Sequence, residues 1–100
     1  MTIDKDKFAE LIDAAKEVGY ESSMCHFLND YGNYHEMIDV QTYLREEKEI
    51  YVDTLFADER YYRCYISEGY RSVSDEDFIG NTYESALLEG LLYACKSLKK

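Results

Sequence analysis

Apolar residues recur every three or four positions near the start of the chain, over residues 8–18. This spacing places them on one face of an α-helix. Asp4 and Asp6 lie at the start of the run and Lys16 near its end, as the helix dipole favours. Gly19 predicts the helix end, because glycine readily adopts the left-handed conformation that follows many helices. The predicted apolar face consists of Phe8, Leu11, Ile12, Ala15 and Val18.

The next part of the chain has a less regular pattern. Ser22 or Ser23 predicts the cap of a second, shorter helix, because a serine hydroxyl can accept a hydrogen bond from a backbone N–H at a helix start. Gly32 is predicted to end that helix. Residues 33–39 mix apolar and polar positions without a clear period, and no element is predicted there. Val40 then begins a third predicted helix.

At Ile50 the pattern changes from helical to alternating spacing. The runs 50–56 and 61–67 are rich in β-branched and aromatic residues that alternate with period two, which is typical of strands. Glu68-Gly69 predicts a turn, and Tyr70 to Ser74 predicts a shorter third strand. The three strands together predict an antiparallel sheet.

A charged loop, Asp75-Glu76-Asp77, separates these strands from a final helix predicted over about 83–98. Thr82 is a suitable N-cap for that helix. Gly90 lies inside it, where glycine costs about 1 kcal/mol relative to alanine, so a close approach of helix and sheet is predicted at Gly90. The wide apolar stripe of the helix consists of Leu87, Leu88, Leu91, Cys95 and Leu98.

The alternation also predicts how the first two strands pair. A loop at 57–59 sets Val52 opposite Cys64 and Asp53 opposite Arg63. This register keeps like side chains on each face of the sheet. A slip by one residue would mix the two faces, and we therefore reject it.

The third strand is placed by the turn that precedes it, which sets Tyr70 opposite Ser67 and Val73 opposite Cys64. One face of the sheet is then predicted to lie under the last helix and the other to face away from it. The predicted core face consists of Ile50, Val52, Phe56, Cys64, Ile66 and Val73. The opposite face consists of Tyr51, Leu55, Tyr61, Arg63, Tyr65 and Tyr70.

The order of elements predicts one α+β domain that spans residues 1–100. Its parts are N-terminal helices, a three-stranded antiparallel sheet over about 50–74, and the C-terminal helix packed on one face of the sheet. A chain of 100 residues buries enough surface for one core but not for two.

Net charge narrows the choice of partners. Lys and Arg number 11 against 21 Asp and Glu, which gives a formal net charge of −10. The resulting field repels phosphate backbones and anionic lipid surfaces, so neither nucleic acid nor a membrane is the expected partner. It attracts basic surfaces, and the sequence therefore predicts a protein partner that carries one.

The first residues and the cysteines predict a cytoplasmic protein. Charges near the start occupy the place where a secretory signal needs an apolar run. The most apolar stretch, Ala86 to Cys95, is broken by Glu89 and is shorter than the roughly 18 residues that a membrane span requires. Three cysteines without a C-x-x-C pair indicate reduced thiols rather than a disulfide framework.

The residues that could carry chemistry predict no catalytic, cofactor or metal site. Cys25-His26 with His35 suggests a nucleophile pair or a metal site. Adjacent residues of a helix point about 100° apart, however, and a structural role is the better interpretation. Cys64 and Cys95 are predicted to be core thiols. The run Asp75-Glu76-Asp77 lacks the spacing of a calcium loop and is interpreted as a solvated turn.

The tyrosine-rich face of the predicted sheet is the strongest candidate for a binding surface. Tyrosine gives a large, rigid contact at low entropic cost, and aromatic residues with arginine are enriched at interface centres. Two alternatives stay open at this point: the N-terminal helices cover this face, or it is simply solvated. The predicted protein-binding residues are Tyr51, Leu55, Tyr61, Arg63, Tyr65 and Tyr70.

Two segments carry a resemblance to a known group of proteins. Tyr43-Leu44-Arg45 precedes the strands, and Thr82-Tyr83-Glu84-Ser85-Ala86-Leu87-Leu88 follows them. Over roughly residues 40–98 the chain resembles short, uncharacterised acidic proteins of phages and prophages in gut bacteria. Those proteins have a Leu-Arg motif before the strands and close with a segment like Ser-Tyr-Glu-Glu-Ala-Leu. The chain departs from them at Ser85, where a glutamate would complete a capping box. The resemblance implies no activity.

A second resemblance is one of topology. The order of helix, three antiparallel strands and helix is also that of double-stranded RNA-binding domains. Those domains place lysines at the start of the last helix, whereas this chain has Thr82-Tyr83-Glu84-Ser85 there. A shared order of elements does not imply a shared function.

These observations predict a non-enzymatic, acidic protein-binding module, in the manner of a phage or mobile-element accessory protein that acts on a host protein. The alternative is a small homodimeric structural or regulatory protein that uses the tyrosine-rich face against a second copy. An enzyme ranks third.

We expect no binding to nucleic acid, because affinity for phosphates depends on cations that release counterions, and here acidic residues outnumber basic ones. Gel shifts with duplex DNA, duplex RNA and single strands at low salt should show no complex. A complex at micromolar protein that weakens steeply with added salt would contradict this prediction.

Overall fold

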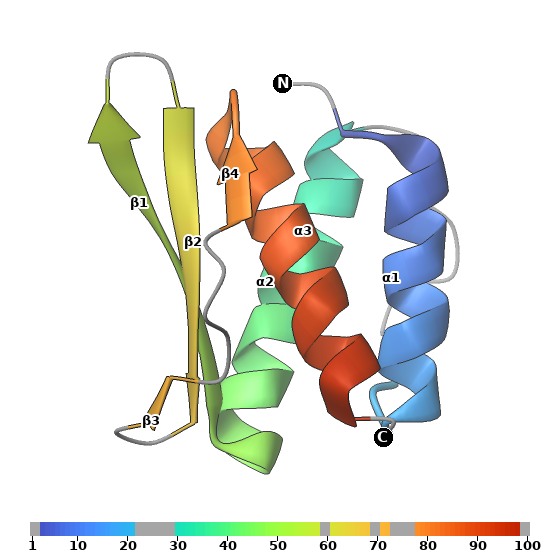
Figure 1. Cartoon of the computed structure of the whole chain (residues 1–100). Coiled ribbons are helices and arrows are strands. Elements are labelled where there is room, and N and C mark those ends of the chain that lie inside the picture. The colour runs from blue at the N-terminus through green and yellow to red at the C-terminus, as the bar shows by residue number, and fades with distance from the viewer. Residues whose placement is uncertain (1–2, 22–29, 59–60, 69–70, 73–77, 99–100) are drawn as a thin grey trace.

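The computed structural model describes residues 3–21, 30–58, 61–68, 71–72 and 78–98. In this part of the chain three α-helices lie on one side of an antiparallel sheet (Figure 1). The fold class is therefore α+β, as the order of elements predicted. None of the described helices lies on the second side of the sheet.

Helix α1 (Lys5–Glu17) begins and ends where the sequence predicted. The Asp4 carboxylate accepts hydrogen bonds from the backbone N–H groups of Asp6 and Lys7, at 3.0 and 3.1 Å. At the other end Gly19 has φ 107°, a conformation that favours glycine. The N–H of Tyr20 donates to the Ala15 carbonyl at 3.0 Å, which is the long bond of a Schellman motif.

Helix α2 (Asp30–Lys48) starts earlier than predicted. The prediction that Gly32 ends a helix and that Val40 begins one is wrong, because both lie inside α2. The period was hard to recognise because the buried face mixes polar with apolar residues. The shorter helix predicted after Ser22 or Ser23 falls mostly on residues 22–29, outside the described part. The buried residues of α2 are Asn33, Glu36, Met37, Val40 and Leu44.

Strands β1 (Ile50–Asp58) and β2 (Tyr61–Glu68) form an antiparallel hairpin. Val52 pairs with Ile66, so the predicted pairing of Val52 with Cys64 is wrong by two residues. The prediction erred because β1 continues to Asp58 through an irregularity after Phe56, which shortens the connection. A shift by two leaves every side chain on its predicted face.

The same shift separates Asp53 from Arg63, which were predicted to pair on the tyrosine-rich face of the sheet. Asp53 lies opposite Tyr65 rather than opposite Arg63, and Arg63 lies opposite Leu55. The cross-strand neighbour of Arg63 is therefore an aliphatic residue and not the predicted aspartate.

Two short strands pair with β2 along the edge that faces away from β1. Strand β3 (Arg71–Ser72) pairs near one end of β2 and β4 (Phe78–Gly80) near the other. Ser67 pairs with Ser72, so the predicted pairing with Tyr70 is wrong. Cys64 pairs with Phe78, so the predicted pairing with Val73 is wrong as well. Strand β4 was not predicted, because three residues are too few to show a period.

Several predicted residues lie outside the described part of the chain. Tyr70, Val73 and the run Asp75-Glu76-Asp77 are among residues 69–70 and 73–77, for which the structure gives no description. Their predicted roles in the outer face, in the core and in a solvated turn stay predictions.

Helix α3 (Tyr83–Leu98) packs across the inner face of the sheet, the face predicted to form the core, and contributes more buried residues to the core than any other described element. The predicted core residues Ile50, Val52, Cys64 and Ile66 are buried beneath it. On its other side α3 packs against α1, which lies away from the sheet (Figure 1). Ion pairs of Lys7 with Glu89 and of Lys96 with Glu10 join these helices. The buried residues of α3 are Ala86, Leu87, Leu88, Gly90, Leu91, Leu92, Ala94 and Cys95.

Phe56 is the one described core residue that the sequence placed wrongly. Its side chain is 63% exposed, although alternation along β1 puts it on the inner face. It lies near the end of an edge strand and packs edge-to-face against Tyr62, with ring centroids 5.5 Å apart. Tyr62 in turn packs against Tyr83 at 6.1 Å. Aromatic stacking at this end of the sheet thus covers one side of Phe56 and leaves the other in solvent.

The start of α3 is capped by a reciprocal pair. The Ser85 N–H donates to Thr82 Oγ1 at 3.1 Å, and the Thr82 N–H donates to Ser85 Oγ at 3.2 Å. Thr82 is therefore the N-cap of α3, as the sequence predicted. Ser85 performs the task that a glutamate has in the usual capping box, so its departure from that pattern costs no hydrogen bond.

Gly90 allows α3 to lie close against the sheet, as the sequence predicted. A Cβ added to Gly90 would lie 2.3 Å from Cys64 Sγ and 3.2 Å from Val52 Cγ1. Both distances are too short for an undisturbed contact. The glycine is therefore retained in a helix interior for its lack of a side chain.

We expect Gly90→Ala to lower the free energy of unfolding by about 1–2 kcal/mol, since overpacking outweighs the gain in helix propensity. Chemical denaturation followed by circular dichroism measures this change. The loss should shrink in a Cys64→Ala background, because the Sγ that the new methyl group meets is gone. A more stable Gly90→Ala variant would contradict the close approach of helix and sheet.

Candidate functional site

The outer face of the sheet is the candidate site. It is the side on which none of the described helices lies (Figure 1), and we define it by the described side chains that point away from α3. Tyr51, Leu55 and Tyr65 are 39%, 58% and 43% exposed on it. The outer face consists of Tyr51, Asp53, Leu55, Tyr61, Arg63, Tyr65, Ser67 and Ile79.

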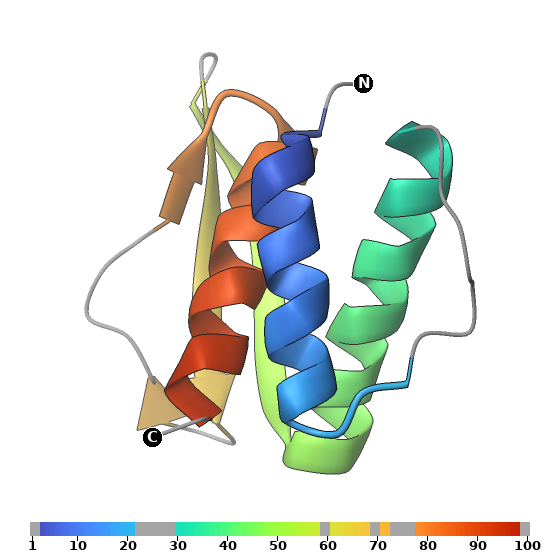
Figure 2. The same cartoon turned by 90° about the vertical axis from the view of Figure 1, so that its right-hand side faces the viewer.

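The structure brings together five of the six residues that the sequence predicted for this surface. Tyr51 and Leu55 come from β1, and the other three from β2. Tyr61 and Arg63 are half-buried. The sixth residue, Tyr70, lies outside the described part. Of the two alternatives to a binding surface, covering by N-terminal helices does not apply to α1 or α2, which lie on the inner side (Figure 2).

Ile79 belongs to the outer face and was missed by the sequence analysis. It pairs with Arg63 from β4 and is 55% exposed. The apolar pair Phe78-Ile79 between an acidic run and the cap of the last helix was the signal that could have revealed it. A row of side chains thus crosses the sheet on this face, from Leu55 through Arg63 to Ile79.

Arg63 occupies the middle of this row. Its guanidinium carbon lies 5.7 Å from the centroid of the Tyr61 ring, within the range of a cation–π interaction. Leu55 and Ile79 flank it on the neighbouring strands. These neighbours restrict the arginine side chain before any partner arrives, which lowers the entropy lost on binding.

The outer face is nearly neutral although the chain is strongly acidic. Asp53 and Arg63 carry opposite charges that cancel, and Asp58 is a further acidic position, opposite Tyr61 at the end of the face. A surface of tyrosines and aliphatic residues around one arginine has the composition of an interface centre.

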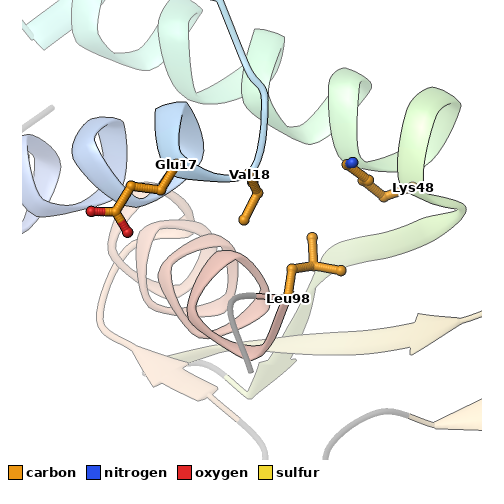
Figure 3. Close-up of a pocket in the computed structure, with 4 residues that line it drawn as sticks. All are labelled: Glu17, Val18, Lys48 and Leu98. Atoms are coloured by element: carbon orange, nitrogen blue, oxygen red, sulfur yellow. The ribbon is translucent and has the colours of Figure 1, made fainter.

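The hollow at the lower end of the helices is a weaker candidate (Figure 3). It has a volume of ≈ 430 Å³ and lies where the three helices end. Val18 and Leu98 point toward one another across it, while the Glu17 carboxylate turns away. Lys48 Nζ lies 6.0 Å from the centroid of the Tyr43 ring. Among the described residues that line the hollow, no cluster of polar groups faces inward to orient a small ligand.

The two described cysteines are buried, free thiols. Burial raises the pKa of Cys64 to about 11, an effect that the neighbouring Thr54 hydroxyl partly offsets. Burial likewise raises the pKa of Cys95 to about 12. A nucleophilic cysteine needs a thiolate near neutral pH, so both are structural thiols, as predicted.

The predicted Cys25, His26 and His35 set can be followed only in part. Cys25 and His26 lie outside the described residues, and His35 is exposed on α2. Among the described side chains, no group of three His, Cys, Asp or Glu residues is placed to hold a metal ion. No described helix is long and apolar enough to cross a membrane.

Comparison of the chain with protein-family models, with curated proteins and with solved structures gives no match.

We expect alkaline pH to destabilise the fold. Burial, and then the nearby Glu36 charge, also raises the pKa of Tyr20, so three buried groups hold their protons more tightly when folded. Their stabilisation is complete below the ordinary thiol pKa of 9.0 and is lost as pH rises through the folded values. Chemical denaturation at pH 8, 9.5 and 11 should give a falling midpoint.

Thiol labelling supplies the matching control. At pH 8 a thiol of pKa about 11 is ionised to about one part in a thousand, so Cys64 in a Cys25→Ser chain should react slowly. The same chain in denaturant should react at the rate of a free cysteine. Equal rates in both conditions would show that the thiols are accessible and that the argument for alkaline loss is wrong.

Proposed function

We propose that this chain is a non-enzymatic, acidic protein-binding module that recognises its partner through the outer face. The observation that carries the proposal is the one-sided arrangement of the fold. All three described helices pack on the inner side, while Tyr51, Leu55, Tyr65 and Ile79 stay exposed on the outer side. Contiguous apolar surface of this kind marks interaction sites in folded proteins.

The chemistry of the outer face supports a protein as the partner. Tyr65 and Tyr51 offer large rings with few rotatable bonds, and Arg63 supplies a central donor for hydrogen bonds. Residues of these types carry most of the binding energy in protein interfaces.

The partner we propose carries a basic surface beside an apolar patch. The net charge of −10 attracts such a protein over a distance, and contact is then made by the nearly neutral outer face. Association should therefore be fast at low salt and slower as salt rises. The free thiols are consistent with the reducing cytoplasm of a bacterium or an infected cell. The resemblance to phage proteins over residues 40–98 supports a host protein as the target.

A second candidate is a homodimer formed through the same face. Asp53 and Arg63 both lie on the outer face, so a two-fold related copy could pair each with the opposite charge of its neighbour. The net charge opposes this arrangement, because each copy carries −10. We therefore rank the homodimer below a basic partner.

We expect Tyr65→Asp to weaken partner capture by at least about tenfold, since it places a carboxylate at the centre of an apolar contact. The full chain, immobilised, is exposed to a host lysate, and captured proteins are quantified by mass spectrometry. Tyr93→Asp is the matched control: it makes the same substitution at a tyrosine of α3 that is 36% exposed and not on the outer face.

Circular dichroism should first show that both variants are folded. Capture that falls equally in the two variants, or in neither, would contradict an interface at the outer face. Light scattering over a range of concentrations tests the second candidate. A stable dimer that Tyr65→Asp and Arg63→Glu each convert to monomer would favour self-association over a separate partner.

A further inference from the structure

We propose that the free edge of β1, at Thr54 and Phe56, binds an extended basic segment of a partner protein as an added strand. The inference rests on the proposed function only in taking the partner to be a protein. It concerns the backbone edge of the sheet, whereas the proposed function concerns side chains of the outer face. The two surfaces meet at Leu55, which is exposed beside both.

Strand β1 is the outermost strand of the sheet (Figure 1). The side chain of Gln41 on α2 donates from Nε2 to the Val52 carbonyl. This carbonyl therefore points away from β2, toward the free edge of β1. Backbone groups alternate in direction along a strand, so the N–H and C=O groups of Thr54 and Phe56 point the same way as those of Val52. Within the described residues, no strand pairs with β1 on that side.

Side chains at this end of β1 also favour an added strand. Phe56 and Leu55 are 63% and 58% exposed, the largest fractions among the exposed large apolar residues of the described chain. They project from opposite faces of the sheet. A strand added at the edge would cover part of both while its backbone pairs with Thr54 and Phe56. Main-chain pairing with side-chain contacts on both faces is the usual mode of strand addition.

Charge selects the occupant of this edge. Natural edge strands are commonly guarded by lysine or proline, and β1 contains neither. Asp53 is the charged residue of β1 whose side chain the structure describes, and it is exposed. Two copies of this chain paired edge to edge would repel each other, because each carries a net charge of −10. A segment in which lysine or arginine alternates with apolar residues would instead meet acidic positions with cations.

Amide hydrogen exchange of the full chain, measured by NMR, tests this assignment. The probe is a short synthetic peptide of alternating lysine and valine at about 1 mM. In the free protein the Thr54 and Phe56 amides should exchange fast, and the peptide should slow both by at least about tenfold. The Leu55 amide points toward β2 and should change little. No slowing at Thr54 and Phe56 would overturn the proposal.

Two N-methylated peptides test the backbone pairing without any substitution in the protein. A peptide that is N-methylated on one set of alternate residues loses the N–H groups that face β1, and a peptide methylated on the other set keeps them. One of the two should therefore lose the slowing and the other retain it. Equal behaviour of the two peptides would show that the probe does not bind as a strand, and would overturn the proposal.

Phe56→Pro supplies a test on the protein side, because proline lacks the outward N–H. It should abolish the slowing at Thr54, whereas the control Phe56→Ala keeps the N–H and should retain most of it. Peptides of alternating glutamate and valine should have no effect. If Thr54 and Phe56 become protected by raising the concentration of the protein alone, the occupant is a second copy and the proposal is wrong.

The result is distinguishable from that of the capture experiment. Tyr65→Asp leaves the backbone of β1 unchanged and should not affect the slowing at Thr54 by more than about twofold. If the peptide does not slow exchange at Thr54 and Phe56 but Tyr65→Asp weakens partner capture, the outer face remains the interface. The reverse outcome would leave strand addition as the mode of binding.

Discussion

The close contact of Gly90 with Cys64 and Val52 is the constraint on which the rest of the fold depends. Because no side chain separates α3 from the sheet there, the leucines on either side of Gly90 reach the inner face and fill the core. Helix α3 is buried over most of its circumference, with its other apolar side against α1. The apolar face of α1 thus packs against α3, on the side of α3 away from the sheet.

Local patterns predicted the elements whose signals depend on near neighbours. The Schellman ending at Gly19, the cap at Thr82 and the two long strands each follow from residues close in sequence. Pairing between strands was predicted less well, because side chains repeat with period two and a shift by two residues leaves the pattern unchanged. Only the connection between β1 and β2 distinguishes the two registers, and an irregularity after Phe56 altered its length.

The outer face was predicted better than the pairing for the same reason. Alternation decides which side of the sheet Tyr51, Leu55 and Tyr65 occupy, and this survives a shift by two. Ile79 could not be found in this way, since β4 is three residues long. Whether helices cover the face was also beyond the sequence: an amphipathic α1 can pack on either side of a sheet, and only the packing of α3 decides between them.

The charges that would attract a partner from a distance lie mainly away from the outer face that would contact it. The carboxylates that give the chain its charge of −10 lie mainly outside the described outer face, where Asp53 and Arg63 balance each other. A basic protein would therefore be drawn to the molecule as a whole. Docking at Tyr65 and Ile79 would nevertheless remove water from few charged groups. Buried interfacial charges often cost as much in desolvation as they return in attraction. A nearly neutral contact surface on an acidic module avoids that cost while it keeps a fast, salt-dependent approach.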